Sequence, residues 1–100
     1  MKKICVIGLG YVGLLAAVVF ASRGFSVIGV DVDVKKVEAV NNGKCYLRET
    51  GLDSLLRDDV SKGFLRATTD AVEAVRESDA VITAMLTSVK EDVANLLYFY

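Results

Sequence analysis

The sequence predicts an α/β fold, a doubly wound parallel sheet with flanking helices. Strand-like apolar runs alternate with helix-like stretches along the whole chain. Strands that are separated by helices pair in parallel through right-handed crossovers. A glycine-rich motif, Gly8-Leu9-Gly10-Tyr11-Val12-Gly13, stands between the first strand-like run and the first helix-like run. We therefore expect a Rossmann-like sheet of about four strands in the order 3-2-1-4.

The first three elements follow from apolar runs and one glycine. Residues 3–8 are predicted to form a buried strand, and residues 26–31 a second one. Between them, residues 12–23 are apolar almost all round, as expected of a helix pressed between the sheet and other elements. Gly24 is placed to end this helix in the C′ position.

The middle of the chain is predicted to contain two helices joined by a loop. Asp33 is a suitable N-cap for a helix over residues 34–42. Residues 44–51 are the expected loop. Four apolar residues then repeat at helical spacing before Gly63, which ends the second helix. They are Leu52, Leu55, Leu56 and Val60.

The last third repeats the alternation of strand and helix. Asp70, with Glu73 three residues later, is similar to a capping box and predicts the start of a short helix. The elements expected here are a strand at 64–68, a helix at 70–77, a strand at 79–85 and a final helix at 93–100.

The glycine motif predicts a dinucleotide site because of its context. Alone, GxGxxG is a weak signal, but here an acid, Asp31, closes the second strand-like run 18 residues after Gly13. This arrangement is typical of dinucleotide-binding folds. Gly8 permits a tight turn, Gly10 lets the backbone approach a pyrophosphate, and Gly13 lets the first helix pack closely on the sheet.

The same pattern favours NAD as the cofactor. The free N–H groups at the start of the first helix would face the phosphates. Asp31 would accept hydrogen bonds from the adenosine ribose and would repel a 2′-phosphate, which favours NAD over NADP. The alternative is that the glycines only serve a strand-to-helix turn and that Asp31 caps a helix. Flavin-binding folds use the same fingerprint, but no further signal in this sequence indicates a flavin.

Topology adds one more candidate residue. In the order 3-2-1-4 the ligand lies at the carboxyl ends of the first and fourth strands, where the order reverses. The segment Leu86-Thr87-Ser88 follows the fourth predicted strand and falls beside the glycine motif. Thr87 is therefore a candidate to hydrogen-bond the cofactor, and a turn or helix-cap role fits its position equally well.

Length and composition exclude several classes of protein. One hundred residues, 53% of them apolar, suit one domain over residues 1–100. A net charge of −1 provides no basic footprint for nucleic acid. The apolar stretch 9–22 is too short for a membrane span.

The few cysteines exclude a metal cluster. The chain has no histidine, and Cys5 and Cys45 are its only cysteines. We expect Cys5 to be a small buried apolar residue and Cys45 to lie in a loop, where a catalytic role is disfavoured. Two unpaired thiols suit a cytoplasmic location.

Four segments together resemble the UDP-glucose/GDP-mannose dehydrogenase family. They are residues 7–14 (IGLGYVGL), 29–33 (GVDVD), 66–70 (RATTD) and 77–82 (ESDAVI). The resemblance covers essentially the whole chain, and the tyrosine and valine inside the glycine motif make it fairly specific. It implies a domain that binds NAD in enzymes that oxidise the C6 hydroxyl of a nucleotide sugar twice, to a carboxylate.

The resemblance also assigns roles to residues. It implies that Val12, Asp31, Lys36 and Thr87 contact NAD, with Lys36 near the adenosine ribose at the start of the second helix. From its position alone, Lys36 is an ordinary exposed helix lysine. The family's nucleophilic cysteine, general base and sugar-nucleotide pocket come from a later domain, and nothing in residues 1–100 matches them. We therefore expect this chain alone to bind cofactor without turnover.

The chain departs from the family in having no proline, where average usage predicts roughly five. This departure fits an engineered or reconstructed domain as well as a natural fragment with altered loops. Because proline stiffens a loop, we expect the segment around Thr87 to be more mobile without proline. A structural module without cofactor binding, and a catalyst of another NAD reaction, are the competing interpretations.

Association between copies is a further expectation. The fourth strand is predicted to be an exposed sheet edge, and the segment 96–100 (LLYFY) is strongly apolar. Such surfaces favour pairing with a second chain. We therefore expect a homodimer formed through the fourth strand or the final helix.

Overall fold

The computed structural model describes residues 2–84 and confirms the predicted fold class. Its four strands form one parallel sheet in the order β3-β2-β1-β4, as the sequence predicts. The strands are β1 (Lys3–Ile7), β2 (Ser26–Val30), β3 (Leu65–Thr68) and β4 (Ala80–Thr83). The helices are α1 (Tyr11–Ser22), α2 (Val34–Asn41), α3 (Leu52–Ser61) and α4 (Ala71–Glu77).

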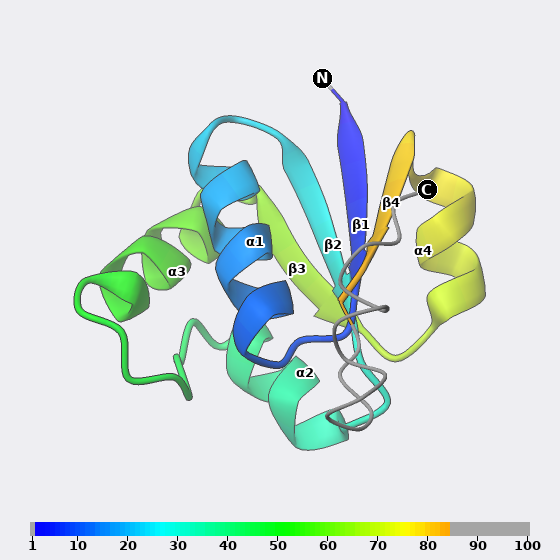
Figure 1. Cartoon of the computed structure of the whole chain (residues 1–100). Coiled ribbons are helices and arrows are strands. Elements are labelled where there is room, and N and C mark those ends of the chain that lie inside the picture. The colour runs from blue at the N-terminus through cyan, green and yellow to red at the C-terminus, as the bar shows by residue number, and fades with distance from the viewer. Residues whose placement is uncertain (1, 85–100) are drawn as a thin grey trace.

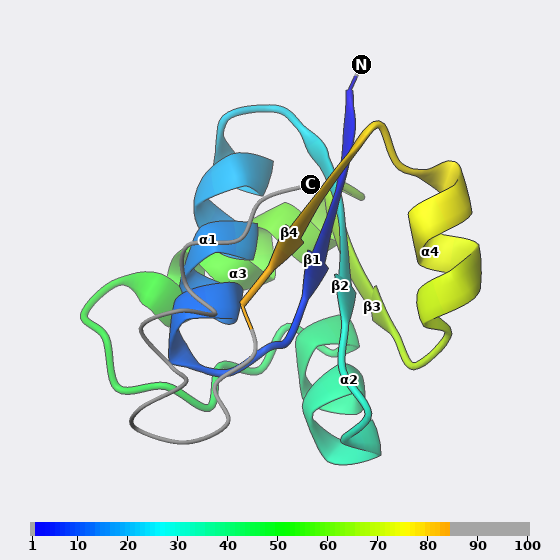
Figure 2. The ribbon, with the colours of Figure 1, turned by 45° about the vertical axis from the view of Figure 1, so that its right-hand side comes forward.

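Helices cover both faces of the sheet. Helices α1 and α3 lie on one side and α4 on the other (Figure 1). The same layers are visible after a 45° turn (Figure 2), with α2 near the carboxyl ends of β2 and β3. The crossover from β3 to β4 therefore passes over the opposite face from α1, which is the doubly wound arrangement.

Alternation along the strands supplies a core on each side. In β1, Ile4 and Val6 pack in the larger cluster with α1, α2 and α3. Cys5, between them, is fully buried in the smaller cluster with Ala74 of α4. Successive side chains of a strand point to opposite faces, so a single apolar run provides both cores. The predicted burial of Cys5 is confirmed.

Several element ends differ from the prediction by one or two residues. Helix α1 begins at Tyr11, one residue earlier than predicted, because the turn ends at Gly10, the N-cap. Gly8 and Asp31 fall just outside β1 and β2. Gly24 has a φ of +96° and follows the C-cap of α1, which confirms the predicted glycine stop. The segments 86–88 and 93–100 lie outside the described residues.

The caps of the short helices are confirmed in part. The Asp33 carboxylate accepts a hydrogen bond from Lys35 N at 2.9 Å, as expected of an N-cap. Asp70 accepts one from Glu73 N at 3.1 Å. In a capping box the Glu73 side chain would accept a hydrogen bond from Asp70 N. Here Asp70 N donates to Thr68 Oγ1 instead.

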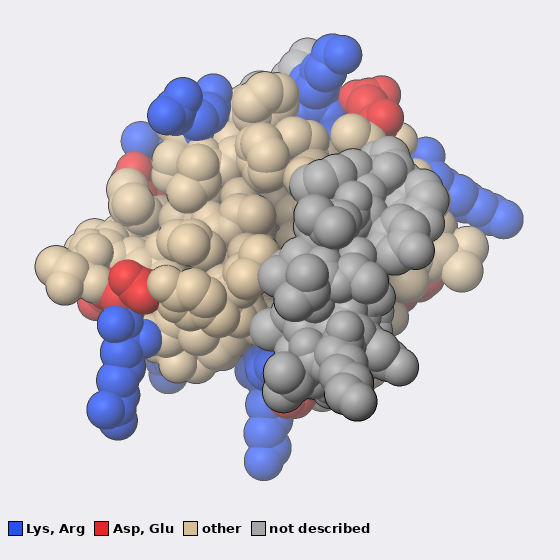
Figure 3. Space-filling view, in the orientation of Figure 1, with Lys and Arg blue, Asp and Glu red and all other residues tan. Residues whose placement is uncertain are grey.

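The outer surface of α1 carries no charge. Its sequence has no acidic or basic residue, and Figure 3 shows an uncharged area over α1 with Lys and Arg side chains around it. The apolar composition of α1 predicts a helix that is covered on all sides. The structure differs, since one side of α1 faces solvent and Val19 is 45% exposed.

The side chain of Asn41 completes the outer edge of β3. Its Nδ2 donates to the Ala67 carbonyl at 2.9 Å, and its Oδ1 accepts from Ala67 N at 2.8 Å. The amide thus replaces one residue of a neighbouring strand. Satisfying the polar groups of an edge strand blocks pairing with other chains.

We expect Asn41→Asp to lower the free energy of unfolding by about 1–3 kcal/mol, because a carboxylate oxygen would then face the Ala67 carbonyl without a hydrogen bond. Urea unfolding of both proteins measures the difference. Asn42→Asp, which adds the same charge one residue later, is the matched control. An equal loss in the two variants would contradict the role of the Asn41 amide.

A buried carboxylate joins α3 to α1. Asp59 is 3% exposed and accepts hydrogen bonds from Ser22 Oγ at 3.0 and 3.2 Å. Burial raises the pKa of the Asp59 carboxyl, the Ser22 bond opposes that rise, and the neighbouring Asp58 adds to it. Folding therefore favours the protonated form of this group.

We expect the stability contributed by Asp59 to be fully present below its unfolded pKa and to be lost as the pH rises through the folded pKa. Asp59→Asn still accepts the Ser22 hydrogen bond and carries no charge, so its stability relative to the natural chain should increase from pH 4 to pH 7. Urea unfolding across this range tests the trend. Asp53→Asn, on the exposed face of the same helix, is the matched control, and an equal trend in the two variants would contradict the role of burial at Asp59.

Candidate functional site

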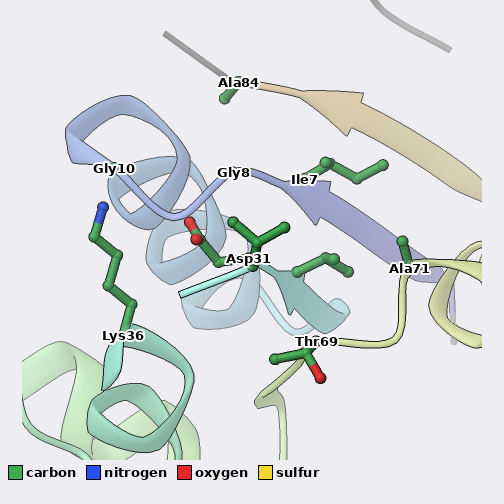
Figure 4. Close-up of a pocket in the computed structure, with 10 residues that line it drawn as sticks. Ile7, Gly8, Gly10, Asp31, Lys36, Thr69, Ala71 and Ala84 are labelled. Atoms are coloured by element: carbon green, nitrogen blue, oxygen red, sulfur yellow. The ribbon is translucent and has the colours of Figure 1, made fainter. Parts of the chain in front are cut away.

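A cleft opens at the carboxyl edge of the sheet. It has a volume of about 600 Å³, which is within the usual range for small-molecule sites. Figure 4 shows the glycine turn after β1 and the end of β2 facing into it, with Lys36 reaching from α2 toward the turn. Its lining residues are Ile7, Gly8, Gly10, Val30, Asp31, Val32, Lys36, Thr69, Ala71 and Ala84.

Gly8 and Gly13 make the glycine turn possible. Gly8 has a φ of +99°, in the left-handed region that favours glycine. A Cβ on Gly13 would lie 1.6 Å from the Gly8 carbonyl oxygen. The close approach that Gly13 allows is with the turn at the end of β1, and the added Cβ would also lie 3.5 Å from Ala84 Cβ, just after β4.

Gly10, in contrast to Gly13, lies next to open space. It lines the cleft, and a Cβ added to it would meet nothing within 4 Å. The missing side chain leaves open space beside the backbone, where a phosphate group can approach closely. This space fits the pyrophosphate of a dinucleotide.

Within residues 2–84, the amino end of α1 has no side-chain cap. Its N-cap is Gly10, and no side chain of this part of the chain bonds to its first N–H groups. These amides belong to Tyr11, Val12 and Gly13, which are in the first turn of the helix. Unpaired N–H groups and the positive end of the helix dipole favour an anion at this place.

Asp31 ties the glycine turn to the start of α2. Its Oδ2 accepts a hydrogen bond from Leu9 N at 2.8 Å, and its Oδ1 accepts one from Asp33 N at 2.9 Å. A carboxylate has about four acceptor positions, so about two remain for a ligand. The side chain is half-buried and faces the turn (Figure 4).

The loop 44–51 also contacts the turn. The hydroxyl of Tyr46 donates to the Leu9 carbonyl, and the hydroxyl of Tyr11 donates to Glu49 Oε1. Burial and the nearby Asp31 raise the pKa of Tyr46 well above its usual value, so its hydroxyl stays protonated. The bond to Glu49 raises the pKa of Tyr11. Lys36 Nζ lies 6.0 Å from the centre of the Tyr46 ring.

The structure brings most predicted site residues to one place. Gly8, Gly10, Asp31 and Lys36 line the cleft, whereas Tyr11, Val12 and Gly13 form the helix turn behind it. Thr87 lies outside the described residues.

Sequence reasoning missed other residues around the cleft. Val32, Thr69 and Ala84 each lie one or two residues after the end of a strand, and Ala71 begins α4. The topology that pointed to Thr87 could have found them, because parallel strands end at one edge. Tyr46 gave no such signal, since its partner Leu9 is 37 residues away.

Two other kinds of feature are absent from residues 2–84. No group of three or more cysteine, aspartate or glutamate residues in this part of the chain could hold a metal ion. None of its helices is long and apolar enough to cross a membrane.

Comparison with known proteins identifies the family. Residues 2–99 match the NAD binding domain of the UDP-glucose/GDP-mannose dehydrogenase family. The chain belongs to this family. Within it, the chain is 48% identical over 91 residues to the UDP-N-acetyl-D-mannosamine dehydrogenase of Campylobacter jejuni, with 91% of this chain and 21% of that protein covered. It is 41% identical over 90 residues to the GDP-mannose 6-dehydrogenase of Pseudomonas savastanoi pv. phaseolicola, covering 90% of this chain and 20% of that one.

Solved structures of family members share the fold. A ternary complex of GDP-mannose dehydrogenase from Pseudomonas aeruginosa superposes with a TM-score of 0.84 at 41% identity, over 88% of this chain and 20% of that one. The UDP-glucose dehydrogenase of Pyrobaculum islandicum gives a TM-score of 0.81 at 40% identity, over 85% of this chain and 20% of that one. The chain thus spans about a fifth of the length of these relatives, in the domain for which NAD is the cofactor.

Proposed function

We propose that the chain binds NAD across the carboxyl edge of its sheet. The observation that carries the proposal is the uncapped amino end of α1, which adjoins a cleft that also contains Asp31. The pyrophosphate would lie against the turn at Gly8 and Gly10 and accept hydrogen bonds from the amides of Tyr11, Val12 and Gly13.

The remaining candidate residues complete this site. Asp31 would bind the adenosine ribose with its free acceptor positions, and Lys36 would supply a positive charge near the turn. Thr87 would contact the cofactor from the segment that follows β4. The assignment of Asp31 and Lys36 to NAD rests on the cleft geometry and on the family's cofactor, and that of Thr87 rests on the family resemblance.

A calorimetric titration of the whole chain with NAD and with NADP tests the proposal. We expect saturable binding of NAD and weaker binding of NADP, because a 2′-phosphate would approach the Asp31 carboxylate. A folded chain that binds neither would have the fold without the function, as a structural module.

We further propose that the protein to which this domain belongs oxidises the C6 hydroxyl of a nucleotide sugar. The support is the similarity to UDP-N-acetyl-D-mannosamine and GDP-mannose dehydrogenases. Since the chain has no histidine and covers a fifth of those proteins, we expect it to bind NAD without turnover. NADH formation with UDP-N-acetylmannosamine or GDP-mannose would contradict that expectation.

A further proposal concerns the association of two copies of the chain. Within the described residues, β4 pairs only with β1, and its side chains are exposed or half-buried. We propose that two copies associate through this edge or through the apolar segment 96–100. A monodisperse monomer in light scattering at high concentration would refute this.

A cytoplasmic location is supported by free thiols at Cys5 and Cys45, and fractionation of the tagged protein tests it.

A further inference from the structure

Leu9, in the glycine turn, is fixed at three points. Its fully buried side chain occupies the space above Gly29, where an added Cβ would lie 2.7 Å from Leu9 Cδ2. Its N–H donates to Asp31. Its carbonyl accepts from the hydroxyl of Tyr46, and this third point comes from outside the strand-turn-helix unit.

The third point fixes the direction of a peptide group whose second residue, Gly10, lines the cleft. The Leu9 carbonyl and the Gly10 N–H belong to one peptide group, which is planar and trans. When Tyr46 fixes the direction of the carbonyl, it also fixes the N–H of Gly10 in the opposite direction. Gly10 is the N-cap of α1 and lines the cleft. The Tyr46 hydroxyl thus acts on the backbone next to the uncapped helix end.

The ring of Tyr46 also supports a charge. Lys36 Nζ lies 6.0 Å from the centre of this ring, within the range of a cation–π interaction. Lys36 is half-buried and points toward the glycine turn (Figure 4). One tyrosine therefore contacts both the turn backbone and the cationic side chain beside it.

The loop that carries Tyr46 has no regular secondary structure, and Cys45, Tyr46 and Leu47 pack against the main core. Residues 44–51 contain no helix, strand or proline. The loop is joined to the turn region by two bonds of opposite direction, from Tyr46 to Leu9 and from Tyr11 to Glu49. Core packing holds the loop in place, and these two hydrogen bonds connect it to the turn and to α1.

We propose that Tyr46 is a positioning residue for phosphate binding, whose hydroxyl orients the Leu9–Gly10 peptide and whose ring holds Lys36 beside the turn. This inference rests on the proposed function, in which the pyrophosphate of NAD binds at that turn. Tyr46 acts on the phosphates through the turn and through Lys36. It leaves recognition of the adenosine to Asp31.

Tyr46→Phe in the whole chain separates the hydroxyl from the ring. Calorimetry with NAD, ADP and adenosine measures the effect. We expect the affinities for NAD and ADP to fall about five- to tenfold, while adenosine binding changes less than about twofold. An unchanged affinity for NAD, or an equal loss for adenosine, would overturn the proposal.

Ser61→Ala is the matched control. It removes another hydroxyl that donates to a backbone carbonyl, that of Asp58 at 3.0 Å, in the last turn of α3. This variant should bind NAD as the natural chain does. Thermal unfolding of both variants shows whether a change in affinity follows from a general loss of stability.

Hydrogen exchange of the unliganded chain keeps the inference separate from the proposed function. The amides of Leu9 and Leu14, which are bonded to the Asp31 carboxylate and to the Gly10 carbonyl, should exchange faster in Tyr46→Phe and at the natural rate in Ser61→Ala. If the natural chain does not bind NAD, the proposed function fails, and exchange still tests the orienting role of Tyr46. Unchanged exchange in Tyr46→Phe would overturn that role.

Discussion

Gly13→Ala should lower the free energy of unfolding by about 3 kcal/mol or more, because its Cβ would lie 1.6 Å from the Gly8 carbonyl oxygen. The obstacle is backbone and not the end of a flexible side chain, so the turn itself must move. Loss of the turn should also reduce NAD affinity by at least about 100-fold, since the phosphate-binding amides would no longer converge. Urea unfolding and calorimetry measure the two effects.

Gly10→Ala is the matched control for this prediction. An added Cβ on Gly10 meets nothing within 4 Å, and its φ of −75° suits any residue. We expect its stability to change by less than about 1 kcal/mol. Its methyl group would nevertheless project into the space next to the turn, so NAD affinity should fall about tenfold or more. Equal losses of stability in the two variants would contradict the distinct roles assigned to the two glycines.

Asp31→Asn should weaken NAD binding by about tenfold or more and reduce the preference for NAD over NADP. An amide has only one acceptor oxygen, so it cannot bond to both Leu9 N and Asp33 N, as the carboxylate does at 2.8 and 2.9 Å. The loss of one charged hydrogen bond should also cost about 1.5–3 kcal/mol of stability. The lost negative charge removes the repulsion of a 2′-phosphate.

Asp33→Asn removes a charge two residues away and serves as the control. Asparagine is as good an N-cap as aspartate, so the bond to Lys35 N should persist. Its affinity ratio for NAD and NADP should match that of the natural chain. If both variants shift this ratio equally, the general charge of the region, and not the Asp31 carboxylate, determines cofactor choice.

The sequence alone predicted most of the fold, because its signals are local. Apolar runs and their alternation gave four strands in the correct order, and Asp33 and Gly24 marked helix ends that the structure confirms. Capping and turn signals act within a few residues, so they can be recognised before the chain is folded. The glycine motif and Asp31 likewise located the cleft, since the ends of neighbouring parallel strands meet at one edge.

Tertiary structure decided the contacts that hold this site and the edges around it. Tyr46 bonds to Leu9 and Ser22 to Asp59 across 37 residues, and Asn41 bonds to Ala67 across 26. No local pattern encodes these pairs, because each depends on how a helix or loop packs against the finished sheet. The sequence therefore determined which elements form and where their ends converge. Packing determined which side chains fix the turn, since a hydrogen bond requires its two partners within about 3 Å.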